Sequence, residues 1–357
     1  MIDKKILTKT FFDLVKIDSP SGQEKKISSY LLRKFLSLGL SPHLDKQRNV
    51  FVKVPGQGFP LLLSAHMDTV EPGRNIRPII KNGIIKSDGT TILGADNKAA
   101  VAVLVEILKY LHAKKLNHRS LEIVFTASEE VANLGAANLD YGGVLAKEGY
   151  IFDNPNPIGT IISGSPFYNR FDISISGKST HSSKPQDGIN VIPIFIHAMR
   201  DINLGKVSEN TLVNIGVVRS GHVRNSVPGE MIIEGEVRSF LEKEVKEYSQ
   251  NIIKTFFLVS KKHDAKIKTS VVRENSGYLY SQKDPFIKKT QDIMRDLRIN
   301  PVLKKIWGCS DANIFLEKGI KVLNLGNGSK DTHTTRESIS IDDLFKLSNL
   351  IFSIVAY

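Results

Sequence analysis

The chain has 357 residues, of which 41% are hydrophobic and 24% charged, a composition typical of a globular protein with two or three domains. No stretch approaches the ~18 consecutive apolar residues of a membrane-spanning helix, and the first residues lack the apolar core of a secretion signal. We therefore expect a cytoplasmic protein without membrane contact. The single cysteine, Cys309, excludes an intrachain disulfide and thiolate-rich metal sites, so any metal ion would need histidine and carboxylate ligands.

Basic residues outnumber acidic ones, 49 against 37, which gives a formal net charge of +12. Such an excess can indicate a nucleic-acid partner or attraction of anionic substrates. The basic residues are scattered, however, and no basic segment is interleaved with aromatic side chains. We therefore expect no nucleic-acid partner and interpret the charge as solvated surface.

The first part of the chain alternates helices and strands. Amphipathic patterns predict a helix over about residues 6–15 and a second that starts from a capping box of Ser21 and Glu24. Further predicted elements are strands at 50–54, 61–68, 121–126 and 150–153, a hairpin at 79–86 and a helix at 97–112. Strands that alternate with helices and each end on a polar residue predict a doubly wound, mainly parallel α/β sheet.

The pattern changes near residue 164. Strands are predicted at 169–176, 211–218, 230–239 and 265–272, and helices at 188–200 and 241–261. This order, βαββαβ, is that of a ferredoxin-like unit. The mixed pattern then returns, with helices at 287–297 and 311–318, a strand at 321–325 and a last helix from residue 342. We therefore predict an α/β domain over residues 1–164 and 279–357, interrupted by a ferredoxin-like domain over residues 165–278.

Polar side chains that suit metal binding stand at the ends of buried elements in the predicted α/β domain. His66 and Asp68 end the strand 61–68 at a two-residue spacing, which puts both on one face of its carboxyl end. There His66 suits a metal ligand, and Asp68 behind it would accept the other ring N–H and fix the tautomer. Six acidic or imidazole residues share such positions: His66, Asp96, Glu129, Glu130, Asp153 and His333.

These six residues supply what a two-metal site needs. Two zinc ions about 3.5–4 Å apart require a bridging ligand and terminal histidine or carboxylate ligands for each ion. We expect His66 and Asp153 to hold one ion. His333 and Glu130 would hold the other, with Asp96 bridging the two ions. Glu129 then remains free, and a free carboxylate beside the attacking water is what general-base hydrolysis needs.

Each residue also has an ordinary structural interpretation. Glu129 and Glu130 suit the start of a solvated helix, and Asp96 suits a helix N-cap. Asp153 can start a turn, and His333, between two threonines, suits a surface loop. The occurrence of all of them at ends of buried elements favours the metal site.

The chain contains, in this order, His66-Met-Asp68, Gly94-Ala-Asp96-Asn-Lys, Thr126-Ala-Ser-Glu129-Glu130, Asp153, Gly177-Lys-Ser-Thr-His181 with Gly188-Ile-Asn, and Gly308-Cys-Ser-Asp311-Ala ahead of His333. This set resembles the co-catalytic zinc peptidases, which include peptidase T, carboxypeptidase G and the aminoacylases. The chain is most similar to the peptidase T branch, because Asp153 stands where carboxypeptidase G-like members carry Glu. The resemblance implies the assignments above, two Zn²⁺ per subunit with Co²⁺ or Mn²⁺ as substitutes, and a non-proline cis peptide after Asp96.

The resemblance also implies a catalytic domain interrupted by a dimerisation lid, in agreement with the βαββαβ segment. His181 lies in this lid, either as an ordinary loop histidine or as a donor to the oxyanion that develops during hydrolysis. A ferredoxin-like lid has an edge strand that a two-fold partner can cover, so we expect a homodimer in which His181 serves the partner's site. Arg238 is either a clamp for a substrate carboxylate or a surface arginine. Asn225 resembles a position near the substrate but also suits a turn.

The function that we expect is hydrolysis of short peptides by a dizinc exopeptidase, a tripeptidase or aminopeptidase of the peptidase T type. An amidohydrolase on the same scaffold, acting as a carboxypeptidase or an N-acyl-amino-acid deacylase, is the first alternative. A non-catalytic scaffold or basic nucleic-acid binder that retains the fold is the second, and the complete ligand set with Glu129 argues against it.

Overall fold

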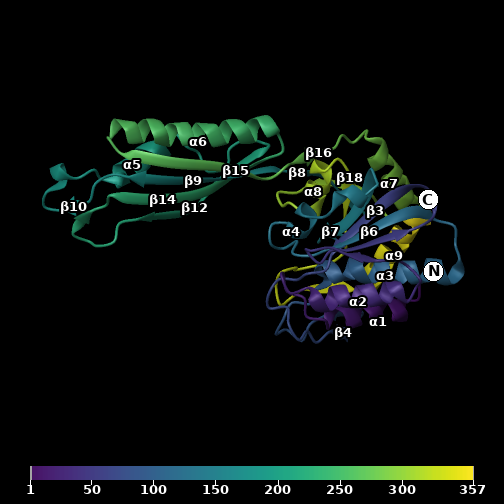
Figure 1. The fold of residues 1–357 in the computed structure, drawn as a ribbon. Coiled ribbons are helices and arrows are strands. Elements are labelled where there is room, and N and C mark those ends of the chain that lie inside the picture. The colour runs from purple at the N-terminus through teal and green to yellow at the C-terminus, as the bar shows by residue number, and fades with distance from the viewer. Residues whose placement is uncertain (1, 357) are drawn as a thin grey trace. The chain divides into compact units, whose positions relative to one another are not determined.

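A computed structural model of the chain describes residues 2–356, which form two compact units. Unit 1 comprises residues 2–163, 280–305 and 310–356, and unit 2 comprises residues 164–279 and 306–309 (Figure 1). The short segment 306–309 belongs to unit 2 although both of its flanks belong to unit 1. Each unit has its own hydrophobic core.

A mixed sheet with a parallel centre forms the middle of unit 1. Strands β6, β3, β7 and β18 are neighbours in this order and pair in parallel, whereas β2 and β8 flank them in antiparallel pairing. The central strands are buried on both faces over most of their length, as expected for a sheet covered by helices. The strands are β1 (His43–Leu44), β2 (Val50–Val54), β3 (Gln57–His66), β6 (Arg119–Thr126), β7 (Glu148–Asn154), β8 (Thr160–Ser165), β17 (Val302–Lys305) and β18 (Lys321–Gly326).

Helices lie on both sides of this sheet, with α1, α2, α3 and α9 on one side and α8 on the other (Figure 1). Helix α3 is buried along most of its length and packs against α1, α9 and β3. The predicted α/β fold with a mainly parallel sheet is confirmed. The helices are α1 (Lys4–Val15), α2 (Lys25–Leu36), α3 (Ala95–Lys114), α4 (Leu134–Ala137), α7 (Pro285–Asp296), α8 (Asp311–Glu317), α9 (Ile341–Ala356) and the 3₁₀ turn η1 (Tyr141–Gly143).

Local predictions in unit 1 were right for the hairpin and wrong for the cap of α2. The hairpin is formed by β4 (Ile79–Lys81) and β5 (Ile84–Lys86), to which β19 (Ser338–Ser340) adds a third strand. No capping box forms at α2, because Ser21 donates to the Asp68 carboxylate and Glu24 accepts from Ser128 instead. The side chains of Ser21 and Glu24 therefore form tertiary hydrogen bonds near the carboxyl end of β3 in place of the cap.

Unit 2 has the predicted βαββαβ order. It runs β9 (Phe167–Ser176), α5 (Val191–Met199), β12 (Thr211–Ser220), β14 (Glu230–Ser239), α6 (Glu242–Lys262) and β15 (Lys266–Asn275). The strands lie in the order β12, β14, β9, β15, all antiparallel, which is the ferredoxin-like arrangement. Short additions are β10 (Thr180–His181), η2 (Pro185–Asp187), β11 (Gly205–Lys206) and β13 (Ser226–Val227). The strand β16 (Tyr278–Leu279) pairs with Gly164 and Ser165 at the end of β8 and is an edge strand of the nine-stranded sheet.

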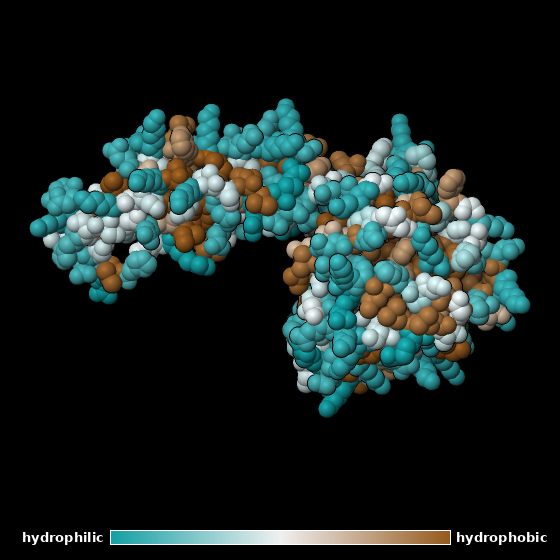
Figure 2. All heavy atoms as spheres, in the orientation of Figure 1, coloured by the Kyte–Doolittle hydropathy of each residue, from teal (hydrophilic) through white to brown (hydrophobic). Residues whose placement is uncertain are grey.

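The surface of unit 2 carries apolar side chains among hydrophilic ones, as one face of it shows in Figure 2. On its two helices the exposed apolar residues are Ile192, Ile196, Phe257 and Leu258. Among the helices formed by residues 2–356, none is long and apolar enough to cross a membrane.

Candidate metal centre

The centre is built at the carboxyl end of β3. This strand is buried over its last six residues, and it ends at His66, which is 2% exposed. The His66 Nδ1 atom lies 3.1 Å from the main-chain oxygen of Asp68 and 3.4 Å from its carboxylate. The Nε2 atom of His66 therefore remains directed at the residues that neighbouring elements supply.

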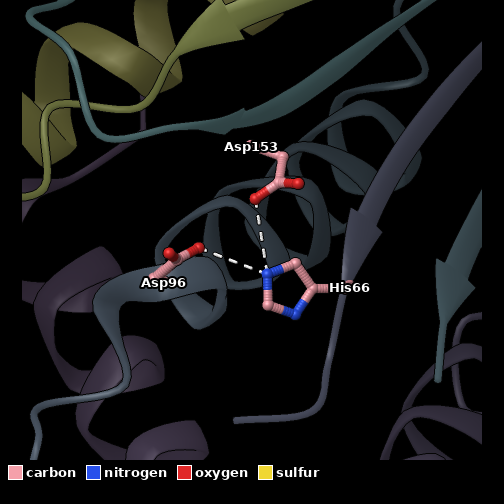
Figure 3. A group of neighbouring side chains, drawn as sticks. All are labelled: His66, Asp96 and Asp153. Atoms are coloured by element: carbon pink, nitrogen blue, oxygen red, sulfur yellow. Dashed lines mark hydrogen bonds and ion pairs between the residues drawn. The ribbon is translucent and has the colours of Figure 1, made fainter. Parts of the chain in front are cut away.

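Two aspartates from different elements meet this nitrogen. The His66 Nε2 atom lies 3.2 Å from Oδ1 of Asp96 and 3.4 Å from Oδ1 of Asp153, as the dashed lines of Figure 3 show. Asp96 stands at the start of α3, and Asp153 stands in β7, which pairs with β3. The three side chains point toward one another and form a compact set of ligand atoms.

A second set shares Asp96. Its other oxygen, Oδ2, lies 3.5 Å from Nε2 of His333, which in turn lies 2.8 Å from Oε1 of Glu130. His333 comes from the loop after β18 and is half exposed, whereas Asp96 is buried. The two oxygens of Asp96 thus face two different histidines, the arrangement that a bridging carboxylate needs.

Asp68 joins the strand end to the turn that carries the two glutamates. Its carboxylate accepts the main-chain N–H groups of Glu129 and Glu130 at 3.0 and 3.3 Å, and the hydroxyl of Ser21 at 2.7 Å. Glu129 lies close to His66 and Glu130, so it is within the centre. Asp68 therefore fixes the ring of His66 and the position of the glutamate turn at the same time.

The loop that carries Asp96 is held by a residue that the sequence reasoning missed. The buried carboxylate of Glu337 accepts the main-chain N–H groups of Leu93, Gly94 and Asp96 at 2.7–2.8 Å. The Asp96–Asn97 peptide bond is cis, as the resemblance implied. Glu337 lies more than two hundred residues after this loop, in a segment without hydrophobic periodicity, so no local signal indicated its role.

The pKa values show how much negative charge the centre concentrates. Burial raises the pKa of Asp153 to about 6, and burial with the charge of Asp153 raises the pKa of Glu129 well above its usual range. Hydrogen bonds to Asp96 and Glu130 raise the pKa of His333 to about 10. Burial disfavours the charged form of His66, but the surrounding carboxylates, Asp153 foremost, hold its pKa well above the usual range. The two imidazoles thus act as counter-ions to the carboxylates.

The donor set fits a pair of divalent cations. Two sets of three ligand atoms, each within 4.8 Å of one another, share Asp96. The donors are imidazole nitrogens and carboxylate oxygens, which suit zinc and other divalent transition metals. Bound cations would replace the imidazolium protons in balancing the buried carboxylates, so charge and geometry both favour metal ions here.

The remaining candidates lie in unit 2. His181 is exposed, and its Nδ1 atom accepts from the N–H group of Ser183 at 3.2 Å and lies 2.7 Å from the Ser183 hydroxyl. Asn225 is also exposed. It lies near His181 because its main-chain oxygen accepts the N–H group of Ser182, the residue that follows His181. The structure therefore brings His181 and Asn225 together at the pairing of β10 with β13.

Arg238 in β14 is already engaged within unit 2. Its guanidinium donates to both carboxylate oxygens of Glu236 at 3.1–3.2 Å and to the main-chain oxygen of Trp307 at 2.9 Å. It also lies over the ring of Tyr168, 4.3 Å from the centroid. A substrate carboxylate would have to compete with Glu236 for this guanidinium.

Comparisons with known proteins decide the family. The sequence profile of Peptidase family M20/M25/M40 matches residues 62–357. The chain belongs to this peptidase family. Peptidase T of Fusobacterium nucleatum is 24% identical to the chain over 99% of it and 82% of its own length.

Two solved structures of the family are similar over almost the whole chain. An aminopeptidase PepT from Bacillus cereus is 30% identical, with a TM-score of 0.95 over 99% of this chain and 98% of its own. A tripeptidase from Staphylococcus aureus is 32% identical, with the same TM-score and the same coverage. These similarities confirm the resemblance to the peptidase T-like branch, and the chain is an enzyme of the peptidase class.

Proposed function

We propose that the chain is a dizinc exopeptidase that hydrolyses short unblocked peptides, a tripeptidase or aminopeptidase of the peptidase T type. The observation that carries this proposal is the position of Asp96 between two histidines, with Glu129 in the same centre and outside the two sets that share Asp96. The similarity to the aminopeptidase from Bacillus cereus and the tripeptidase from Staphylococcus aureus supports the substrate class.

In this proposal each ion has its own terminal ligands. His66 and Asp153 would hold one ion, and His333 and Glu130 would hold the other. Asp96 would help to hold both ions, since its two carboxylate oxygens face His66 and His333. Zinc is the metal that this mixture of imidazole and carboxylate donors favours at low coordination number, and Co²⁺ or Mn²⁺ would be substitutes with the same donors.

When bound, the ions polarise the scissile carbonyl and lower the pKa of water. The remaining chemistry belongs to the chain. Glu129 takes a proton from the attacking water and returns it to the nitrogen of the leaving amine. Asp68 contacts Nδ1 of His66 and accepts the main-chain N–H group of Glu129. It therefore fixes the position of the base Glu129 relative to the ligand His66.

Unit 2 is, in the same proposal, a lid and dimerisation domain of a cytoplasmic homodimer. His181 would donate to the developing oxyanion in the partner's site, and Asn225 beside it would contact the substrate. Arg238 would bind a substrate carboxylate if Glu236 releases it. The exposed apolar residues of α5 and α6 support a second copy as the partner.

A substrate panel tests the proposal. The purified protein is stripped with a chelator, reconstituted with Zn²⁺, and offered free tripeptides, amino-acetylated tripeptides, carboxy-amidated tripeptides and N-acyl-amino acids. We expect release of the first residue from free tripeptides, slower release from amidated ones, which lack the carboxylate that Arg238 would bind, and none from acetylated ones. Turnover of acetylated peptides or acyl-amino acids would replace the proposal with the carboxypeptidase or deacylase alternative.

A further inference from the structure

The turn that carries Glu129 has an unusual main chain. Ser128, Ala132 and Asn133 have φ values of 51°, 57° and 55°, in the left-handed region that residues other than glycine seldom adopt. Asparagine is among the residues that tolerate this region best. The turn closes with a hydrogen bond from the N–H group of Asn133 to the main-chain oxygen of Glu129. This hydrogen bond places the side chain of Asn133 beside the side chain of Glu129.

The Asn133 side chain is buried between two carboxylates. Its amide nitrogen lies 2.8 Å from Oε1 of Glu129 and 3.1 Å from Oδ1 of Asp311, and Asn133 is only 4% exposed. The NH₂ group of Asn133 donates to both carboxyl groups, and its two hydrogens satisfy both contacts. The orientation of the amide follows from its surroundings.

Asp311 is itself held by a further hydrogen bond. It lies in the first turn of α8 and is 2% exposed, and its second oxygen accepts the hydroxyl of Thr126 at 2.6 Å. Thr126 is the last residue of β6 and is fully buried. A chain of hydrogen bonds therefore runs from the end of β6 through Asp311 and Asn133 to one oxygen of Glu129.

We propose, on the basis of the proposed function, that Asn133 is a positioning residue for Glu129 and that Asp311 holds Asn133 in place. A base acts on the water only if its free oxygen points there, and a glutamate side chain has three rotatable bonds. The amide occupies Oε1 and leaves Oε2 for the proton. Because the donor is neutral, it orients the carboxylate without the formal positive charge by which lysine or arginine would weaken the base.

The principal test is Asn133→Gly, which removes the amide and keeps a residue that accepts a positive φ. We expect kcat for a tripeptide to fall roughly 10- to 100-fold, the scale of a small misplacement of a catalytic group, with KM within about twofold and metal content unchanged. Asn138→Ala is the matched control, since that exposed asparagine bonds only to the main chain of Leu134, and its kcat should stay at the wild-type value. An unchanged kcat in Asn133→Gly would overturn the proposal.

A double variant separates positioning from a general structural role. If Asn133 acts through Glu129, adding Asn133→Gly to Glu129→Gln should leave the residual rate unchanged, because the base is already absent. A further fall by the same factor as in the wild type would show an independent role and overturn the proposal. Further along the same series of hydrogen bonds, Asp311→Ala should reproduce the loss of kcat. Asp311→Asn keeps an acceptor for Asn133 and should restore part of the activity.

A crystal structure of Asn133→Gly gives a readout that does not depend on the substrate. The carboxylate of Glu129 should rotate or become disordered while the ligand side chains stay in place, and an unmoved Glu129 would overturn the proposal. Failure of the proposed function has a different signature, since the wild-type protein would then hydrolyse no free peptide whatever the position of Glu129.

Discussion

Glu129 and Glu130 are adjacent in the chain, yet their side chains have different partners. Glu130 contacts His333 at 2.8 Å, whereas Glu129 contacts the amide of Asn133 at the same distance. We therefore predict that Glu129→Ala lowers kcat by at least about 100-fold with both metal ions retained, because it removes a general base. Glu130→Ala should lose metal, because it removes a ligand. Inductively coupled plasma mass spectrometry of the two purified variants measures their metal content, and equal contents would contradict the assignment.

Asp68 has more contacts than a residue that only orients His66 would need. Asn at this position offers one acceptor oxygen, and its NH₂ group would face an N–H group of Glu129 or Glu130. We predict that Asp68→Asn keeps the fold and both metal ions but loses about 10- to 100-fold in kcat/KM, the scale of a lost partner behind a metal ligand. A rate equal to the wild type would return Asp68 to an ordinary polar strand end.

At the scale of elements, the start of α3 depends on Glu337. Removing this carboxylate leaves three buried N–H groups without their acceptor, and one such group costs about 1–3 kcal/mol. We predict that Glu337→Ala lowers the free energy of unfolding of unit 1 by at least about 2 kcal/mol and weakens metal binding through Asp96. Denaturant unfolding and a zinc titration measure both effects. Glu337→Gln keeps one acceptor and should lose less, and a larger loss in Gln than in Ala would contradict this account.

The sequence predicted those parts of the fold that depend on local periodicity and on strand ends. The strand of His66, the helix after Asp96 and the βαββαβ order were visible because apolar spacing is a local property. The capping box at Ser21 and Glu24 failed because the same side chains found tertiary partners in Asp68 and Ser128.

The supporting contacts of the site could not be predicted in this way. Glu337 and Asn133 act through hydrogen bonds whose partners are set by the packing of separate elements. Asp311 stands in a recognised motif, but its contact with Asn133 joins residues 178 positions apart. Sequence patterns therefore indicate candidate metal ligands more readily than they indicate what holds those residues in place.

At the scale of the whole molecule, the candidate ligands all lie in unit 1. Ligands that bind only the native state stabilise it, by about 4.1 kcal/mol when the free ligand concentration is a thousand times the dissociation constant. We predict that chelation lowers the unfolding temperature of unit 1 and leaves that of unit 2 unchanged, as measured by calorimetry. Two transitions that shift together would contradict this prediction.

His181 has the chemistry that a donor to a partner's site requires. Its Nδ1 atom accepts the N–H group of Ser183, so the neutral ring carries its proton on Nε2, a hydrogen-bond donor on an exposed side chain. β15 lies at one edge of the sheet of unit 2, where a second copy can cover it. These two features support the homodimer in which His181 acts in trans.

Hybrid dimers test the trans arrangement. Glu129→Ala and His181→Ala are each expected to be nearly inactive as homodimers, because every site lacks either its base or its partner's donor. In a mixed dimer, the site with intact Glu129 receives His181 from the Glu129→Ala subunit and should recover activity, whereas the other site lacks both groups. Mixing the variants should therefore restore up to a quarter of the wild-type activity per subunit, since half of the dimers at equal mixing are hybrids with one complete site. Subunit exchange is followed by native mass spectrometry with one isotope-labelled variant, and exchange without recovered activity would rule the trans arrangement out.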